Sequence, residues 1–176
     1  MTDLVTLAEA QAYLQLDAAS ADLADLVTNI SAQVEAYTGR YFIQRQVTEY
    51  QDGGGCDLFL QHSPVVGTPT VTDLETGLPV TGFVSYPQEG ILYLPGGWPA
   101  GRRRYEVQYV AGYAADTSEV PKDVKQAALE WIYARYYRRD AGLSREALGD
   151  YSWSGEAGIP SAVRLVLQRY LVPVAR

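Results

Sequence analysis

The segment that decides the fold is PKDVKQAALEWIYARYYRR, residues 121–139. Its first residue, Pro121, suits the first turn of a helix, because an amide at that position would have no partner within the helix. Apolar and aromatic residues then recur at spacings of three and four, which is the period of an α-helix. The segment therefore predicts a helix over residues 121–139.

Two stripes run along this predicted helix with the same spacing. One stripe consists of Val124, Ala127, Ala128 and Trp131, and the other of Leu129, Ile132, Tyr133 and Tyr136. Either the helix crosses the centre of the fold with both sides buried, or one stripe packs internally while the tyrosine-rich stripe meets a neighbouring subunit. The spacing leaves both arrangements open.

Two more helices are predicted towards the N-terminus. Thr6 and Glu9 form the S/T-x-x-E pattern of a capping box, which predicts a helix over residues 7–14. A single apolar stripe with a period of three to four predicts a second helix over residues 20–38. Gly39 supplies its left-handed end.

The C-terminal part is predicted to form an arm. Residues 141–159 mix glycine, serine and isolated aromatic residues without a clear period, which indicates an extended connection. A last short helix opens at Pro160 and must bury its apolar stripe against its own bundle or a partner. The residues predicted to dock the arm are Tyr151, Trp153, Val163, Val166, Leu167, Tyr170 and Leu171.

Between these helices, the residues from about 41 to 113 form short β-rich runs separated by turn residues such as Gly, Pro and Asp. They predict an inserted antiparallel β region. The expected fold class is α+β, mainly α: a small helical bundle with an inserted antiparallel β region and a C-terminal helical arm. Residues 1–140 would form the core, and residues 141–176 the extended connection and the arm.

The composition excludes several classes of function. A single cysteine, Cys56, rules out an internal disulfide, and with the only histidine, His62, it cannot build a zinc site of cysteines and histidines. The formal net charge of -7 repels phosphate backbones, which argues against a dedicated nucleic-acid binder. No stretch approaches the roughly 20 apolar residues that cross a bilayer, so we expect no membrane contact.

No residue pattern predicts catalysis. His62 stands beside Ser63, but neighbours on a strand point to opposite faces, and no G-x-S-x-G elbow is present. The glycine run at residues 53–55 lacks the lysine and the hydroxyl residue of a phosphate-binding loop. We therefore predict no catalytic, cofactor-binding or metal-binding residues, and no enzymatic activity.

Two clusters are candidates for contacts with other molecules. The chain has 14 tyrosines against 3 phenylalanines and 3 tryptophans, and tyrosine and arginine often anchor interfaces. The predicted subunit interface consists of Tyr133, Tyr136, Tyr137, Arg138 and Arg139. The run Arg102, Arg103 and Arg104 either occupies solvated edge positions that discourage strand aggregation or docks an acidic partner or DNA.

Several segments resemble one known family, in order and over nearly the whole chain. They are VTLAEA (5–10), VEAYTGR (34–40), SPVV (63–66), VQYVAGY (107–113), VP (120–121), YYRR (136–139) and LGDYSWS (148–154). Each segment alone is short, but their combination resembles the head-to-tail connector family of tailed phages, whose members are also called adaptor or head completion proteins. The host particle could be a phage, a prophage or a gene transfer agent.

This resemblance implies a ring, usually twelve-fold, below the portal protein. The ring would join the portal to the next neck component, a stopper or a tail terminator, and double-stranded DNA would pass through it. The arm would then dock on the portal. The expected location is the neck of a virion or phage-like particle that is assembled in the bacterial host cytoplasm, and the family supplies no catalytic residues.

Two alternatives remain at this point. A different neck or tail-completion protein would share the acidic and aromatic character but attach on the tail side. A carbohydrate-binding or hydrolytic module of a tail would instead place Trp98 or Tyr93 on an open sheet face beside carboxylates.

Overall fold

The computed structural model describes residues 3–18, 20–141, 145–148, 151–154 and 158–172; for residues 138–141, 145–148 and 151–154 it describes the backbone alone. The chain divides into two compact units. One unit is continuous, Arg40–Ala115, and the other combines Met1–Gly39 with Asp116–Arg176.

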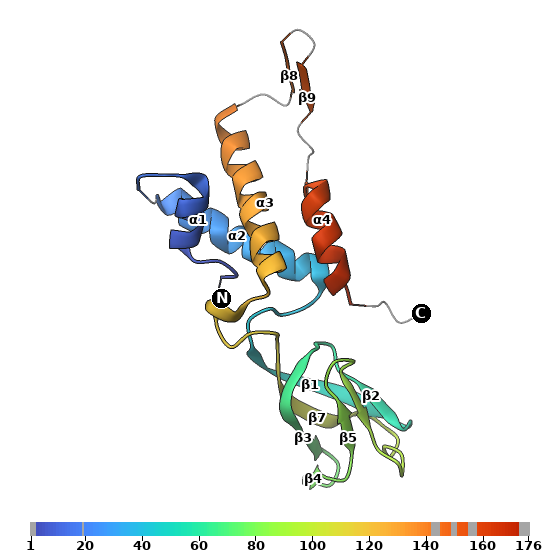
Figure 1. Ribbon diagram of the computed structural model, residues 1–176. Helices are drawn as coiled ribbons and strands as arrows, with labels where there is room; N and C mark the ends of the chain where they lie inside the picture. The colour runs from blue at the N-terminus through green and yellow to red at the C-terminus, as the bar shows by residue number, and fades with distance from the viewer. Residues whose placement is uncertain (1–2, 19, 142–144, 149–150, 155–157, 173–176) are drawn as a thin grey trace. The chain divides into compact units, whose positions relative to one another are not determined.

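The unit that combines Met1–Gly39 with Asp116–Arg176 is mainly helical (Figure 1). Its α-helices are α1 (Leu7–Leu14), α2 (Ala21–Thr38), α3 (Lys122–Ala141) and α4 (Ser161–Leu167). A short 3-10 turn at Thr117–Glu119 precedes α3, and another at Gln168–Tyr170 follows α4. Between α3 and α4, β8 (Arg145–Leu148) pairs with β9 (Tyr151–Ser154) as an antiparallel hairpin. Helix α3 packs against α1, α2 and α4, so it is the centre of this unit.

Local capping fixes where the helices begin and end. The hydroxyl of Thr6 accepts a hydrogen bond from the amide of Glu9 at 3.1 Å, and the Glu9 carboxylate accepts one from the amide of Thr6 at 2.7 Å. Gly39 ends α2 with a φ of +69°, a conformation that favours glycine. The predicted capping box and the predicted glycine stop are both confirmed.

Helix α3 buries one of its two predicted stripes completely. Val124, Ala127, Ala128 and Trp131 are at most 2 % exposed. The second stripe is divided: Ile132 is fully buried, whereas Tyr133 is 49 % exposed. The arrangement in which both sides of the helix are buried is therefore wrong at the tyrosine end.

The continuous unit, Arg40–Ala115, consists of β-strands, and Figure 1 labels most of them. A four-stranded antiparallel sheet has the order β1-β7-β3-β4, and a three-stranded antiparallel sheet has the order β2-β6-β5. The strands are β1 (Arg45–Gly53), β2 (Asp57–Phe59), β3 (Val65–Asp73), β4 (Leu78–Val80), β5 (Val84–Tyr86), β6 (Ile91–Tyr93) and β7 (Gly101–Ala111).

Both sheets contribute to one apolar core. Leu58 and Leu92 come from the smaller sheet, and Val107 comes from the larger one. Trp98 is 2 % exposed, and its indole N–H donates to the carbonyl oxygens of Cys56 at 3.0 Å and Leu92 at 3.2 Å. A buried polar atom that finds its partners in this way costs little to bury.

The predicted fold class needs correction. An α+β fold that is mainly α is wrong, because helix and strand occur in roughly equal amounts. The β region is a compact unit with its own core, to which β7 contributes alternate side chains, β3 contributes Val65 and Val71, and β1 adds the partly buried Val47. The hairpin β8–β9 was expected only as an extended connection. The proposed division at residue 140 stays a prediction.

Within the described residues, no helix is long and apolar enough to cross a membrane.

Candidate interaction surface

A cluster of tyrosines joins α1 to α3 on the surface of the helical unit. The ring of Tyr13 meets the ring of Tyr133 edge-on, with centroids 6.3 Å apart, and Tyr133 lies 4.6 Å from Tyr137. Tyr136 adds an edge contact with Tyr137 at 5.5 Å. We refer to Tyr13, Tyr133, Tyr136 and Tyr137 as the tyrosine cluster.

The tyrosine cluster is fixed in place and yet incompletely covered. The Tyr137 hydroxyl donates to the carbonyl oxygen of Leu14 at 3.3 Å, and the Gln126 amide donates to the Tyr13 hydroxyl at 3.3 Å. Tyr13, Tyr133 and Tyr137 nevertheless remain 37 %, 49 % and 45 % exposed. Prepositioned aromatic rings lose little rotamer entropy on binding, so the cluster is suited to a protein contact.

The structure brings together only part of the predicted interface. It places Tyr133, Tyr136 and Tyr137 in one cluster, and it adds Tyr13, which is not part of the predicted interface. The side chains of Arg138 and Arg139 lie outside the described part of the structure. Their backbone continues α3 directly after the cluster.

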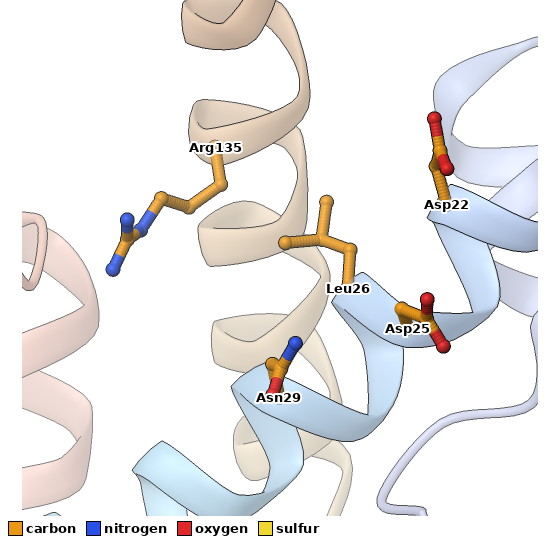
Figure 2. Close-up of a pocket in the computed structure, with 5 residues that line it drawn as sticks. All are labelled: Asp22, Asp25, Leu26, Asn29 and Arg135. Carbon is orange, nitrogen blue, oxygen red and sulfur yellow. The ribbon is translucent and has the colours of Figure 1, made fainter.

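An open hollow lies between α2 and α3 (Figure 2). Asp22, Asp25, Leu26 and Asn29 line it from α2, and Arg135 lines it from α3. Figure 2 shows that the Arg135 guanidinium points away from the two carboxylates; it donates to the Gln33 side chain at 3.3 Å. The hollow thus offers acceptors to a basic partner, but it contains no nucleophile with a base.

The predicted docking arm is partly integrated into the helical unit. Val163 and Leu167 are fully buried, while α4 packs against α3 and α2. The amide of Val172 donates to the carbonyl oxygen of Thr38 at 3.1 Å. These contacts agree with the alternative in which the stripe of the last helix packs on its own bundle.

The other side of the same segment is open. Leu165 is 67 % exposed, Leu171 40 % and Val172 37 %, whereas Val166 and Tyr170 are half-buried. Tyr151 and Trp153 belong to β9, and their side chains lie outside the described residues. If the arm docks, the described surface that is available for docking is the one around Leu165.

The arginine run divides into separate roles. The Arg104 guanidinium lies 2.8 Å from the Asp73 carboxylate and 2.5 Å from that of Glu75, within the β unit. Hydrogen bonding to Arg104 holds the pKa of Asp73 below its usual range. Arg103 lies over the ring of Tyr50 at 4.9 Å. Arg104 is therefore occupied by ion pairs within its own unit. Docking or DNA contact by the arginine run remains a prediction.

The adjacent His62 and Ser63 do not form a catalytic pair. Ser63 accepts a hydrogen bond from Arg40 at 2.7 Å, and the His62 ring stacks on Tyr41 with centroids 4.1 Å apart. The exposed thiol of Cys56 lies elsewhere in the β unit, beside Asp57. The described residues include no group of His, Cys, Asp and Glu that could hold a metal ion.

The β unit holds one more buried acid, and it is satisfied by hydrogen bonds. Glu49 is 6 % exposed and accepts hydrogen bonds from the Tyr109 hydroxyl at 3.0 Å and from the Gln51 side chain at 2.8 Å. Burial, together with the charge of Glu49, raises the pKa of Tyr109 well above its ordinary value. This buried hydrogen bond joins β1 to β7.

The structure does not support Trp98 as a carbohydrate-binding residue. Trp98 is buried between the sheets and cannot stack on a sugar. Tyr93 does line a shallow depression with Asp57, Tyr86, Glu89 and Ile91. The sequence does not predict this surface, because strands of three residues are too short to show an alternation of apolar and polar side chains.

Comparison with known proteins settles the family. The model of one family, described as head completion protein, matches residues 3–171. The chain belongs to the head completion protein family. Head completion proteins are structural components of the head-to-tail neck, and the prediction of a neck connector protein in a virion or phage-like particle is confirmed. No curated protein matches the chain.

Solved structures support the head completion fold over the full length. The chain is similar to a protein in the neck of a native gene transfer agent particle computed with C12 symmetry, with a TM-score of 0.68 and 20 % identity, covering 99 % of this chain and 96 % of that one. A chain in the neck of an empty particle computed with C6 symmetry gives 0.67 at 23 % identity, covering 98 % and 92 %.

A third similar chain comes from the virion of a native gene transfer agent particle. Its TM-score is 0.66 at 22 % identity, and the match covers 98 % of this chain and 92 % of that one. At such identities the likeness establishes a shared fold, and it includes both the helical and the β unit of the head completion protein.

Proposed function

We propose that this head completion protein forms a closed ring in the neck of a phage-like particle. The ring joins the portal to the next neck component, a stopper or a tail terminator, and lets double-stranded DNA pass. It acts by assembly and catalyses no reaction. The observation that carries the proposal is the tyrosine cluster, which is packed in a fixed geometry and left about half exposed in the single chain.

The similar folds support a ring of twelve subunits. Two of them belong to necks computed with C12 and C6 symmetry, and a twelve-fold ring is compatible with both. Rings of identical subunits need a surface on each chain that contacts the next chain. The predicted interface of Tyr133, Tyr136, Tyr137, Arg138 and Arg139 would be part of that surface.

The charge of the chain supports DNA passage without DNA binding. A formal charge of -7 per subunit is multiplied around a ring. An acidic wall repels the phosphate backbone, whereas a lumen lined with lysine and arginine would hold it through released counterions. DNA can therefore slide through such a ring without being gripped.

The arm would connect the ring to the portal. Its buried side chains, Val163 and Leu167, anchor α4 on the helical unit, and the exposed Leu165 faces outward from the same helix. A portal groove that accepts Leu165 and Leu171 would add apolar contact to each subunit. The twelve equivalent contacts of one ring would then act together.

The proposal is tested by the masses of assemblies and by neck incorporation. Replacing Tyr133 and Tyr137 by Ala should abolish rings whose mass is twelve times that of the 19.3 kDa chain, while the circular dichroism of the monomer is retained. Tyr50→Ala is a matched control, because Tyr50 is 43 % exposed and lies in the other unit. Normal rings from the double variant would contradict the proposed interface, and a wild-type chain that is absent from particle necks would contradict the proposed function.

A further inference from the structure

Within the described residues, the outer face of the three-stranded sheet exposes large apolar and aromatic side chains, among them Phe59, Val84 and Tyr86. In the register of this sheet, Phe59 lies beside Ile91, and Ile91 lies beside Tyr86. The next outward row joins Asp57, Tyr93 and Val84. We refer to these six residues as the outer sheet face.

The exposure of the outer sheet face contrasts with that of the inner row. Leu58 and Leu92, which point inward, are at most 2 % exposed. Phe59 is 64 % exposed, although it is the largest apolar side chain on β2. Large contiguous patches of exposed apolar side chains are rare on soluble monomers, and they commonly mark interaction sites.

The outer sheet face also carries a definite charge. Its shallow depression is lined by Asp57, Tyr86, Glu89, Ile91 and Tyr93, which include two carboxylates and no cation. Two copies of this face pressed together would bring like charges into contact, which is unfavourable. The face is therefore suited to a different surface, one that offers aromatic rings and positive charge.

The chain itself offers such a surface. The tyrosine cluster presents half-exposed rings and hydroxyl groups, and α3 continues from Tyr137 into Arg138 and Arg139. Tyrosine and arginine combine apolar area with donors that carboxylates accept. Both surfaces combine aromatic rings with polar groups, and in the sequence the two residues after Tyr137 are basic, whereas two carboxylates line the depression on the outer sheet face.

Resting on the proposed ring, we infer that the outer sheet face of one subunit receives the tyrosine cluster of the next subunit. A ring requires two different complementary surfaces on each chain, because a surface that pairs with itself closes a two-fold dimer. The tyrosine cluster supplies one of these surfaces, and the outer sheet face supplies the other. The partner on this face is thus a second copy of the same chain.

The only cysteine makes a direct test possible. Cys56 is exposed and precedes Asp57 at the edge of the outer sheet face. Ala12→Cys adds an exposed thiol next to Tyr13 without removing a tyrosine. In assembled necks, a short thiol-to-thiol linker should join Cys56 of one subunit to this new cysteine of the next, giving a ladder of covalent oligomers.

Two matched controls accompany the linkage. Ala162→Cys places an exposed thiol on α4 instead and should yield at least ten-fold less linked product. Adding Cys56→Ser to the Ala12→Cys chain should abolish the ladder. If necks assemble normally and the ladder from Ala12→Cys does not exceed that from Ala162→Cys, the inference is overturned while the proposed ring stands.

A second, independent measurement uses surface variants. Phe59→Ser should raise the concentration needed for ring formation about ten-fold or more. Leu78→Ser is the control, since Leu78 is equally exposed at 65 % but lies on β4 of the other sheet. Equal ring formation by both variants would overturn the inference; a wild-type chain that forms no ring at all would instead refute the proposed function, and the inference with it.

Discussion

The hydroxyl of Tyr170 donates to the carboxylate of Asp123, with distances of 2.9 and 3.0 Å to its two oxygens. Tyr170 ends the turn that follows α4, and Asp123 lies in the first turn of α3. The contact ties the C-terminal segment to the central helix. With the burial of Val163 and Leu167, it holds in place a helix of only seven residues, which is too short to be stable alone.

Tyr170→Phe should therefore loosen the C-terminal segment. It removes a hydrogen bond to a charged acceptor and keeps the ring, so we expect the free energy of unfolding to fall by about 1 to 2 kcal/mol. Urea unfolding measures this loss, and hydrogen exchange at the amide of Val172 should become faster. Tyr133→Phe is the control. Unchanged exchange at Val172 would show that the bond does not hold the segment.

Glu9 should make stability depend on pH. Partial burial alone would raise the pKa of its carboxyl group, but hydrogen bonds from Lys125 and Thr6 outweigh this effect and lower the pKa below its ordinary value of 4.5. Because the pKa is lower in the folded state than in the unfolded state, the carboxylate contributes its full stabilisation at pH values above about 4.5. The contribution is lost as the pH falls through the folded-state pKa.

The matching variant is Glu9→Gln. It should reduce stability at pH 7 by less than about 1 kcal/mol, because the pair is partly exposed to solvent. The difference from the wild type should vanish as the pH approaches 3. Melting temperatures measured from pH 3 to pH 7 test this, and a difference that grows towards low pH would contradict the assignment.

Alanine substitutions at two neighbouring residues of α3 should have different effects, one mainly on stability and the other mainly on assembly. Ile132 is fully buried and Tyr133 is 49 % exposed. Ile132→Ala should cost about 2 to 5 kcal/mol of unfolding free energy, as core truncations do. Tyr133→Ala should cost less than half as much and should impair assembly instead. A large loss of monomer stability in Tyr133→Ala would identify this tyrosine as core.

Gly53 should tolerate no side chain. A Cβ atom there would lie 2.0 Å from the carbonyl oxygen of Pro99. Gly53→Ala should therefore destabilise the β unit by more than about 2 kcal/mol, because backbone must move. At Gly96 an added Cβ meets nothing within 4 Å, so Gly96→Ala should melt like the wild type. Equal melting of both variants would refute this account.

The sequence predicted the helices better than the sheets, for a physical reason. Helix ends depend on residues three or four positions apart, such as Thr6 and Glu9, and these signals are visible locally. The pairing of β1 with β7 instead joins residues such as Arg45 and Ala111. Such distant pairing depends on the burial of a shared core, and no local pattern specifies it.

The candidate interface was predictable only in part. The spacing of Tyr133 and Tyr137 along one helix placed them together, whereas the approach of Tyr13 is a tertiary contact between α1 and α3. Phe59 was missed for a different reason. Its strand has three residues, and the face that these residues form appears only when β2, β6 and β5 are aligned side by side.

Substitutions on the two sides of α4 should have separate effects, one on stability and one on docking. Leu167 is fully buried and Leu165 is 67 % exposed, although they lie two positions apart on the same helix. Leu167→Ala should lower the free energy of unfolding by about 2 to 5 kcal/mol, since it leaves a cavity beside α3. Leu165→Ser removes only exposed surface, so the monomer should unfold at the same urea concentration as the wild type. If α4 docks on the portal, Leu165→Ser should still reduce the amount of this protein bound to portal-containing heads. Sedimentation of the variant with purified heads measures that amount, and Ala162→Ser is the control because Ala162 is exposed on the same helix. Normal binding by Leu165→Ser would show that the portal contact lies on another surface, whereas unfolding of this variant would contradict the exposed position of its side chain.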